Sequence, residues 1–148
     1  MTSENGKTSP TNGSTKKVVI QGRYYGDKTF PSLNNYLAEI GKNPRAGGRM
    51  KKDYMWVCIS AIRKYLKGWK VTKPPIIIHY KFYEPSKGQK RDVSNIFSLF
   101  AKFFEDALQQ TNVIENDNPA WVQNFTAEFE WIDEEPYIEV EIEEDLNG

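Results

Sequence analysis

The sequence predicts an α+β fold: one domain in which a mixed β-sheet packs against two or three helices. Runs rich in β-branched and aromatic residues, typical of strands, alternate along the chain with runs whose apolar residues recur every three or four positions, typical of amphipathic helices. The length of 148 residues is that of one ordinary domain, which can bury roughly two-thirds of its unfolded surface. These observations predict a single packed core.

The first half of the chain predicts an arm, one strand and two helices. Residues 1–15 are polar and nearly free of apolar side chains, which indicates a disordered arm before a folded domain at 16–148. The run KKVVIQG has strand character, and SLNNYLAEIGK predicts a short helix opened by Ser32. A longer helix is expected from about Arg49, with Gly68 ending it.

The second half predicts three strands and one helix. PPIIIHYKFYEP reads as a strand with Ile78, Tyr80 and Phe82 on one face. Ser94 to Gln110 fits a helix with a broad apolar face, and Ser94 is a favourable residue to open it. The last two runs, 122–132 and 137–144, alternate apolar and acidic residues around the turn DEEP, which indicates an antiparallel hairpin.

The charges are segregated along the chain although the net charge is zero. Up to Arg91 there are 19 Lys and Arg against 5 Asp and Glu, and from Asp92 onward there is 1 against 15. A surface that only needed solubility would mix the signs. The pattern therefore suggests polyanion binding beside a site that needs carboxylates.

Several functional classes are disfavoured by the composition. Cys58 is the only cysteine and lies in an apolar helical pattern, so we expect a buried thiol and a protein of the reducing cytoplasm. The sequence opens without an apolar signal core, and no apolar run approaches the ~20 residues of a membrane span. His79 stands alone on a strand, where packing or a satisfied hydrogen bond is expected rather than catalysis. Without a Ser-His-Asp, Cys-His or zinc-spaced set, covalent catalysis is disfavoured.

The segment from 90 to 117 carries the residues best suited to chemistry. Asp92 follows a strand, Lys102 is the only cation of the acidic half, and Asp117 lies in the polar turn IENDN. Two carboxylates that converge could hold Mg²⁺ with waters and a phosphate, and Lys102 could stabilise charge on that phosphate. Taken singly, these features also fit a helix cap, a surface ion pair between Lys102 and Asp106, and an ordinary turn.

Two basic stretches could follow a phosphate backbone. The glycine-containing stretch 41–52 is expected to be a loop, and KGQKR at 87–91 adjoins Asp92. A solvated basic face is the alternative for both. Their candidate DNA-binding residues are Lys42, Arg45, Arg49, Lys51, Lys52, Lys87, Lys90 and Arg91.

The ordered motifs resemble those of the RusA-type endodeoxyribonucleases, Holliday junction resolvases of prophages and bacteria. Apart from the arm, the likeness covers most of the chain, including RMKK, KRDVSN, EDAL, VIENDN and the final IEVEIEE. Its most specific part is the ordered set Asp92, Asn95, Lys102, Asp106, Ala107, Leu108 and Asp117. The family pattern is an Asp-x-Asp-Asn turn, a helical lysine, Asp-Ala-Leu, and an acidic or amide residue followed by Asp.

The resemblance implies a homodimer that binds branched DNA and nicks four-way junctions symmetrically with Mg²⁺ or Mn²⁺, in DNA recombination and repair. Asp92, Lys102 and Asp117 would be the catalytic residues, and Asp92 and Asp117 the metal ligands. Ser94 stands where the pattern has its second Asp. It would ligate the metal weakly or orient a metal-bound water, and Asp106 or Glu115 could add charge.

Three functions follow from these features. The first is an active, metal-dependent junction resolvase. The second is a branched-DNA-binding protein that has lost cleavage because of Ser94. The third is a prophage adaptor whose acidic strands bind a protein partner.

Overall fold

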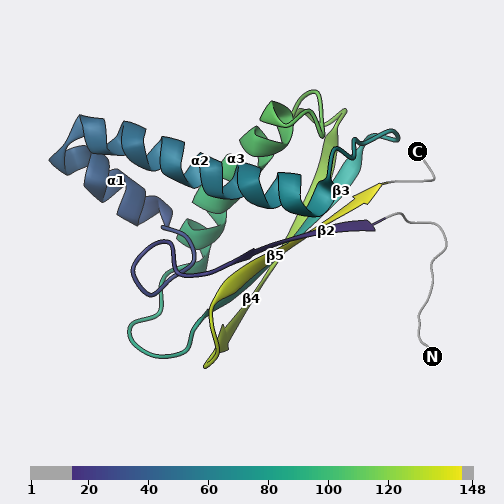
Figure 1. Ribbon diagram of the computed structural model, residues 1–148. Coiled ribbons are helices and arrows are strands. Elements are labelled where there is room, and N and C mark those ends of the chain that lie inside the picture. The colour runs from purple at the N-terminus through teal and green to yellow at the C-terminus, as the bar shows by residue number, and fades with distance from the viewer. Residues whose placement is uncertain (1–14, 145–148) are drawn as a thin grey trace.

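The computed structural model describes residues 15–144, which form an α+β fold with a four-stranded mixed sheet and three helices (Figure 1). The strands are β2 (Thr15–Gln21), β3 (Ile76–Pro85), β4 (Val122–Ile132) and β5 (Tyr137–Glu144). The helices are α1 (Leu33–Lys42), α2 (Pro44–Leu66) and α3 (Val93–Gln110). The predicted fold class is confirmed. The predicted arm lies outside the described residues, except for Thr15, which begins β2.

The order of strands in the sheet is β2-β5-β3-β4; β3 and β4 are parallel, and the other two neighbouring pairs are antiparallel. The predicted hairpin of the last two strands is therefore wrong, because β3 lies between them. β5 carries the fully buried Ile138, Val140 and Ile142 and takes a central place, whereas most side chains of β4 are exposed and it takes an edge. The connection 133–136 passes the end of β3, where the N–H of Ser86 donates to the Ile132 carbonyl at 2.8 Å.

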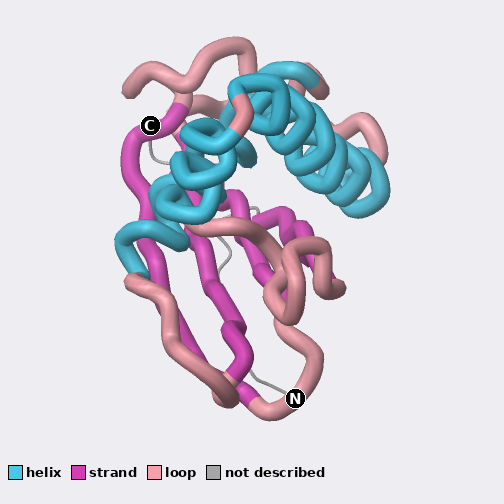
Figure 2. Tube along the Cα trace, turned by 90° about the vertical axis from the view of Figure 1, so that its left-hand side faces the viewer, coloured by secondary structure: helices cyan, strands magenta, loops and turns pink. Residues whose placement is uncertain are grey.

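All three helices lie on one face of the sheet, and no other element of residues 15–144 covers the opposite face, which we call the uncovered face (Figures 1 and 2). The core between the layers contains Tyr80 and Phe82 of β3 and Phe100 and Phe104 of α3, with their rings in mostly edge-on contacts. Cys58 is buried there as predicted, and burial raises the pKa of its thiol. Among residues 15–144, no helix combines the length and apolar character needed to cross a bilayer.

The uncovered face of the sheet is acidic. Residues that pair across strands share a face, so the register places five glutamates there: Glu128, Glu130, Glu139, Glu141 and Glu143. Lys17 and Lys81 share that face. His79 lies there too, with ring nitrogens 2.7 Å from Thr126 Oγ1 and 2.8 Å from a Glu143 oxygen, which confirms its predicted hydrogen-bonding role. This face is poorly suited to a polyanion.

The predicted loop 41–52 is helical in the structure. Asn43 ends α1 and also caps α2, because its side-chain oxygen accepts the Arg45 N–H at 3.0 Å. Pro44 occupies the first helical position, where its missing N–H costs nothing. Gly47 is needed because a Cβ there would lie 2.5 Å from Cγ1 of Ile40. The glycines thus serve close packing of α1 on α2 rather than loop flexibility.

Candidate nucleic-acid and metal site

Asp92 is the N-cap of α3, at the end of the chain segment that leaves β3. One of its carboxylate oxygens accepts the N–H of Ser94 at 2.9 Å, and its own carbonyl accepts from Asn95 and Ile96. The prediction that Ser94 opens this helix is therefore wrong by two residues. An Asp at this position accepts a hydrogen bond from a first-turn N–H that has no partner within the helix, and its negative charge is stabilised by the positive end of the helix dipole. The second carboxylate oxygen makes no hydrogen bond within residues 15–144, so it is available to a ligand.

Arg91 is built into the fold. Its guanidinium makes a bidentate ion pair with Glu84, with the closest contact at 2.8 Å, and side-chain exposures of only 11% and 4%. It also donates to the Phe30 carbonyl at 2.8 Å and to Asn35 at 3.3 Å. With these donors engaged, Arg91 has little left for a phosphate. We therefore withdraw the predicted DNA contact for this residue, which instead holds β3, α1 and the start of α3 together.

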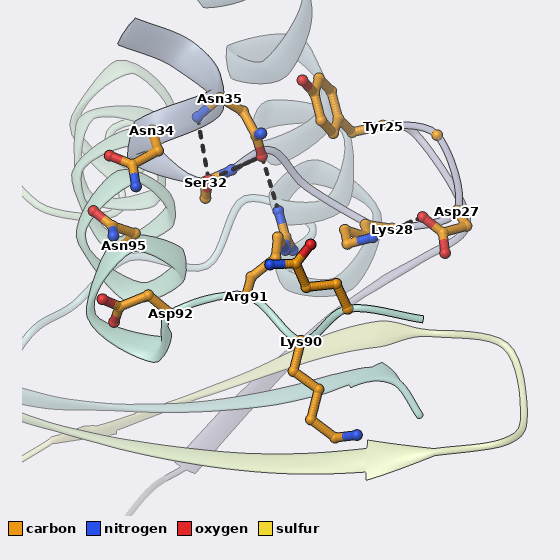
Figure 3. Close-up of a pocket in the computed structure, with 12 residues that line it drawn as sticks. Tyr25, Asp27, Lys28, Ser32, Asn34, Asn35, Lys90, Arg91, Asp92 and Asn95 are labelled. Atoms are coloured by element: carbon orange, nitrogen blue, oxygen red, sulfur yellow. Dashed lines mark hydrogen bonds and ion pairs between the residues drawn. The ribbon is translucent and has the colours of Figure 1, made fainter. Parts of the chain in front are cut away.

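A pocket of about 450 Å³ opens beside Asp92 (Figure 3). Asn34 of α1 and Asn95 of α3 lie one above the other next to the carboxylate, and Lys28 lies across the opening, 2.8 Å from Asp27. Of the residues that line this pocket, Lys90, Arg91, Asp92 and Asn95 were expected from the sequence to lie near Asp92. Lys28 and Asn34 were missed, because they come from a distant segment that only the tertiary fold brings to Asp92.

The remaining predicted cations are exposed. Lys87 and Lys90 lie on the loop before α3, and the Lys90 ammonium turns out of the pocket, 3.3 Å from the Ser86 carbonyl (Figure 3). The others line the α1–α2 corner and the outer part of α2: Lys42, Arg45, Arg49, Lys51 and Lys52. The cations of α1 and α2 and the acidic sheet face thus belong to different surfaces.

A second polar cluster, the C-terminal cluster, consists of Lys102, Glu105, Asp106 and Asp117. Lys102 and Asp106 form the expected surface pair at 3.4 Å. Glu105 accepts a hydrogen bond from Tyr80 Oη at 2.9 Å. Burial raises the pKa of Glu105 and the nearby charges of Asp117 and Asp106 add to that rise, whereas the Tyr80 bond and Lys102 oppose it. Glu105 was not among the residues expected from the sequence. Its place at the border of the apolar face of α3 was a signal that its carboxylate is partly buried.

The two predicted metal ligands do not meet within one chain. From Asp92 to Leu108 the helix rises about 24 Å at 1.5 Å per residue. The N–H groups of Val113 and Ile114 bond the Leu108 carbonyl at 2.9 and 3.4 Å, and the three residues on to Asp117 span about 10 Å at most. Asp117 also lies near enough to Glu105 to raise the pKa of that carboxyl, and Glu105 is about 20 Å along α3 from Asp92. The two aspartates are therefore too far apart for two short side chains to share one cation. Lys102, about 15 Å along α3 from Asp92, groups with Asp117 instead.

The donors of a single chain do not fit the predicted metal site. Within residues 15–144, no group of three or more His, Cys, Asp and Glu side chains converges to hold an ion. Ser94 is exposed in the first turn of α3 beside Asp92, and Asp106 belongs to the other cluster. One chain thus presents two half-sites: Asp92 with its pocket, and the C-terminal cluster.

No protein-family model matches this chain, and no curated protein sequence matches it. The resemblance to the RusA-type nucleases therefore rests on the residues and their order alone.

Proposed function

We propose that the protein is a metal-dependent endonuclease of four-way DNA junctions, active as a homodimer in the cytoplasm, in DNA recombination and repair. The observation that carries the proposal is the pocket at Asp92, where a carboxylate with an available oxygen lies among amide and ammonium groups. Such a set suits a cation and a phosphate together, since the cation needs carboxylate oxygen and the phosphate needs N–H donors. The motif resemblance gives the same assignment.

The charges of the two faces support DNA on the helix side. The outer surface of α1 and α2 carries the exposed cations, whereas the uncovered sheet face carries five glutamates. A phosphate backbone is attracted to the first surface and repelled by the second. The Asp92 pocket is lined by residues of α1, α3 and the loops next to them, on the attracting side.

The separation of the two half-sites supports a site shared between two chains. If two copies pair about a two-fold axis with their α3 helices antiparallel, Asp92 of one chain approaches Asp117 and Lys102 of the partner subunit. Asp92, Asp117 and Ser94 would then be the oxygen ligands of the cation. A divalent cation held there would supply positive charge and a nucleophilic water at the scissile phosphate.

The edge strand β4 offers a surface for this pairing. It is 11 residues long, and Phe125 on its helix side is 50% exposed while packing on Phe97 of α3, with ring centroids 5.1 Å apart. Antiparallel pairing centred on Ala127 would set Phe125 opposite the partner's Phe129. It would also set Glu130 opposite the partner's Asn124, so no like charges would oppose each other. The same operation makes the two α3 helices antiparallel.

Mixing two inactive variants tests the shared site. Asp92→Asn and Asp117→Asn should each abolish cleavage of a synthetic four-way junction in Mg²⁺ or Mn²⁺ while leaving junction binding intact, because each removes one ligand charge. After denaturation and refolding together, the mixed dimers have one intact site, so nicking should return to about a quarter of the parental rate for random pairing. Failure of the mixture to nick, with both variants folded and dimeric, would contradict the shared site.

The double variant Asp92→Asn/Asp117→Asn is the matched control. Mixed with the parent, it forms dimers without an intact shared site, although one chain in each is unaltered. Because about a quarter of the dimers are then parental by random pairing, a shared site predicts about a quarter of the parental rate, and a rate near one half would show that both ligands act within one chain.

A cleavage-deficient junction-binding protein is the second candidate. It is favoured by Ser94, a neutral hydroxyl where the family pattern has a charged ligand. Salt-sensitive binding of the junction by the parent, without nicks in either metal, would establish this function instead.

A further inference from the structure

The outer face of α2 carries a stripe of cations around an exposed tryptophan. At 100° per residue, Arg49, Lys52 and Arg63 fall within about 40° of Trp56, so the four side chains share one line along the helix. All four are exposed, and Trp56 is 59% exposed. From Arg49 to Arg63 the stripe is about 21 Å long at 1.5 Å per residue. We call these four residues the α2 stripe.

Trp56 is not needed to complete the core. The buried side of α2 already supplies Met55, Cys58, Ile59, Ile62 and Leu66. Trp56 lines two hollows: one of about 470 Å³, shared with Tyr24 and Tyr65, and one of about 810 Å³, shared with Lys52 and Gln110. The Arg63 guanidinium lies 5.8 Å from the centroid of the Trp56 ring. A large aromatic surface with a cation beside it is therefore open to a ligand.

The charges identify the class of that ligand. α2 has Asp53 as its one acidic residue, against six cations: Arg45, Arg49, Lys51, Lys52, Arg63 and Lys64. A second copy presenting the same face would meet repulsion between the two sets of cations. A single DNA strand has both a charged backbone for the cations and base faces for the indole, and such a pairing of groups is typical of sites that bind single strands.

The stripe is connected to the Asp92 pocket through the segment 22–31. Tyr24 lines both hollows beside Trp56, and its carbonyl accepts a 2.6 Å hydrogen bond from Tyr54 of α2. The next residues of the same segment, Tyr25 and Lys28, line the pocket at Asp92. One DNA strand could therefore lie across both places.

We propose that Trp56 is a stacking platform for an unpaired DNA base, with Arg49, Lys52 and Arg63 holding the phosphates on either side of it. The proposal rests on the proposed function for the choice of DNA, and it adds a binding site for the strand that opens at a branch. It requires no metal.

Binding to a strand with and without bases tests the proposal. A labelled oligothymidylate and an abasic oligomer with the same number of phosphates are titrated by anisotropy in EDTA. The parent should prefer the oligothymidylate. Trp56→Ala should lose about tenfold in affinity for the oligothymidylate, in the range measured for one stacked base, and little for the abasic strand. Trp56→Phe should retain part of the preference.

Two control variants separate the effect of stacking on Trp56 from the effect of losing a charge and from the effect of losing any exposed apolar side chain. Lys52→Ala should weaken both strands equally and lower the salt slope by about 0.7 per lost contact. Leu37→Ala, at an apolar residue of α1 that is 53% exposed, should change neither affinity.

Three outcomes would overturn the proposal: no binding of the oligothymidylate by the parent, equal effects of Trp56→Ala on both strands, or a change of oligomeric mass in Trp56→Ala. The last would make the stripe a protein interface. Base-dependent binding through Trp56 by a parent that never nicks a junction would remove the proposed nuclease function and leave this inference standing.

Discussion

The two ends of α3 differ in what surrounds their carboxylates. At the N-terminal end Asp92 is exposed, serves as the helix cap and adjoins amides and Lys28. In the C-terminal half, Glu105 is partly buried against Tyr80 and shares its surroundings with Lys102 and other acids. The N-terminal end can offer one carboxylate ligand to a metal ion, in a pocket whose N–H donors suit a phosphate. The C-terminal half instead offers the ammonium of Lys102 among several carboxylates. A rigid helix of 18 residues keeps them apart, so neither end alone matches the predicted site.

The N-terminal end depends most on the buried pair of Arg91 and Glu84. Arg91→Ala should lower the free energy of unfolding by about 3–5 kcal/mol, because it leaves the Glu84 charge buried without its partner. Urea denaturation followed by circular dichroism measures this. Lys90→Ala, at an exposed neighbour, should change stability by about 0.5 kcal/mol or less. Equal stability of Arg91→Ala and the parent would mean that the pair does not hold this end, and would return Arg91 to the DNA-binding candidates.

Local patterns in the sequence were enough to predict most of the fold. The two-residue period of β3 and the three- and four-residue period of α3 predicted which side chains are buried, and Ser32 was correctly expected to open α1. These features depend on neighbours within one element. The helical structure of the stretch 41–52 was missed because its glycines suggested a flexible loop, whereas Gly47 is buried against Ile40.

Features that depend on distant contacts could not be predicted. The position of β5 between β2 and β3 depends on which whole strands take the central places in the sheet. The short connection at 133–136 suggested a hairpin instead, because it gives no sign of that strand order. Arg91 was predicted to contact DNA because its sequence neighbours are basic and polar. Its actual partner, Glu84, lies on the preceding strand and meets Arg91 only in the folded chain. The order of Asp92, Lys102 and Asp117 was clear in the sequence, but the helix between them sets their distance.

Lys102→Ala tests whether the C-terminal half takes part in chemistry. It should lower junction-cleavage turnover by about 10²-fold with little loss of binding, as expected for a group that meets charge developing in the reaction. Mixed with Asp92→Asn it should recover activity, since the two lesions lie in different half-sites. Mixed with Asp117→Asn it should not. An unchanged turnover would leave Lys102 as the surface partner of Asp106, seen at 3.4 Å.

Ser94→Asp tests the N-terminal half-site from the opposite direction. A carboxylate beside Asp92 adds a charged ligand, so the metal concentration for half-maximal cleavage should fall several-fold and the rate should rise. Stability should change little, because a negative charge in the first helical turn is favourable. A metal titration of junction cleavage measures the effect, with Ser98→Asp one turn further along α3 as the control. An unchanged titration would show that Ser94 does not face the cation.

Glu105→Gln should have the smallest effect, on stability and its dependence on pH. Because burial raises the pKa of Glu105 above its ordinary value of 4.5, the stabilising contribution of the neutral carboxyl is fully present below that ordinary value and is lost as the pH rises through the raised one. At pH 7 the charged carboxylate therefore opposes folding, whereas Gln stays neutral and still accepts the Tyr80 hydrogen bond. The variant should melt about 1–3 °C above the parent at pH 7, with a smaller gain at pH 4. Glu115→Gln, at an exposed acid, should show no such pattern. A lower melting temperature of Glu105→Gln at pH 7 would mean that Lys102 stabilises the charged Glu105 by more than burial costs, and that the C-terminal half is an attractive ion-pair network rather than a set of competing carboxylates.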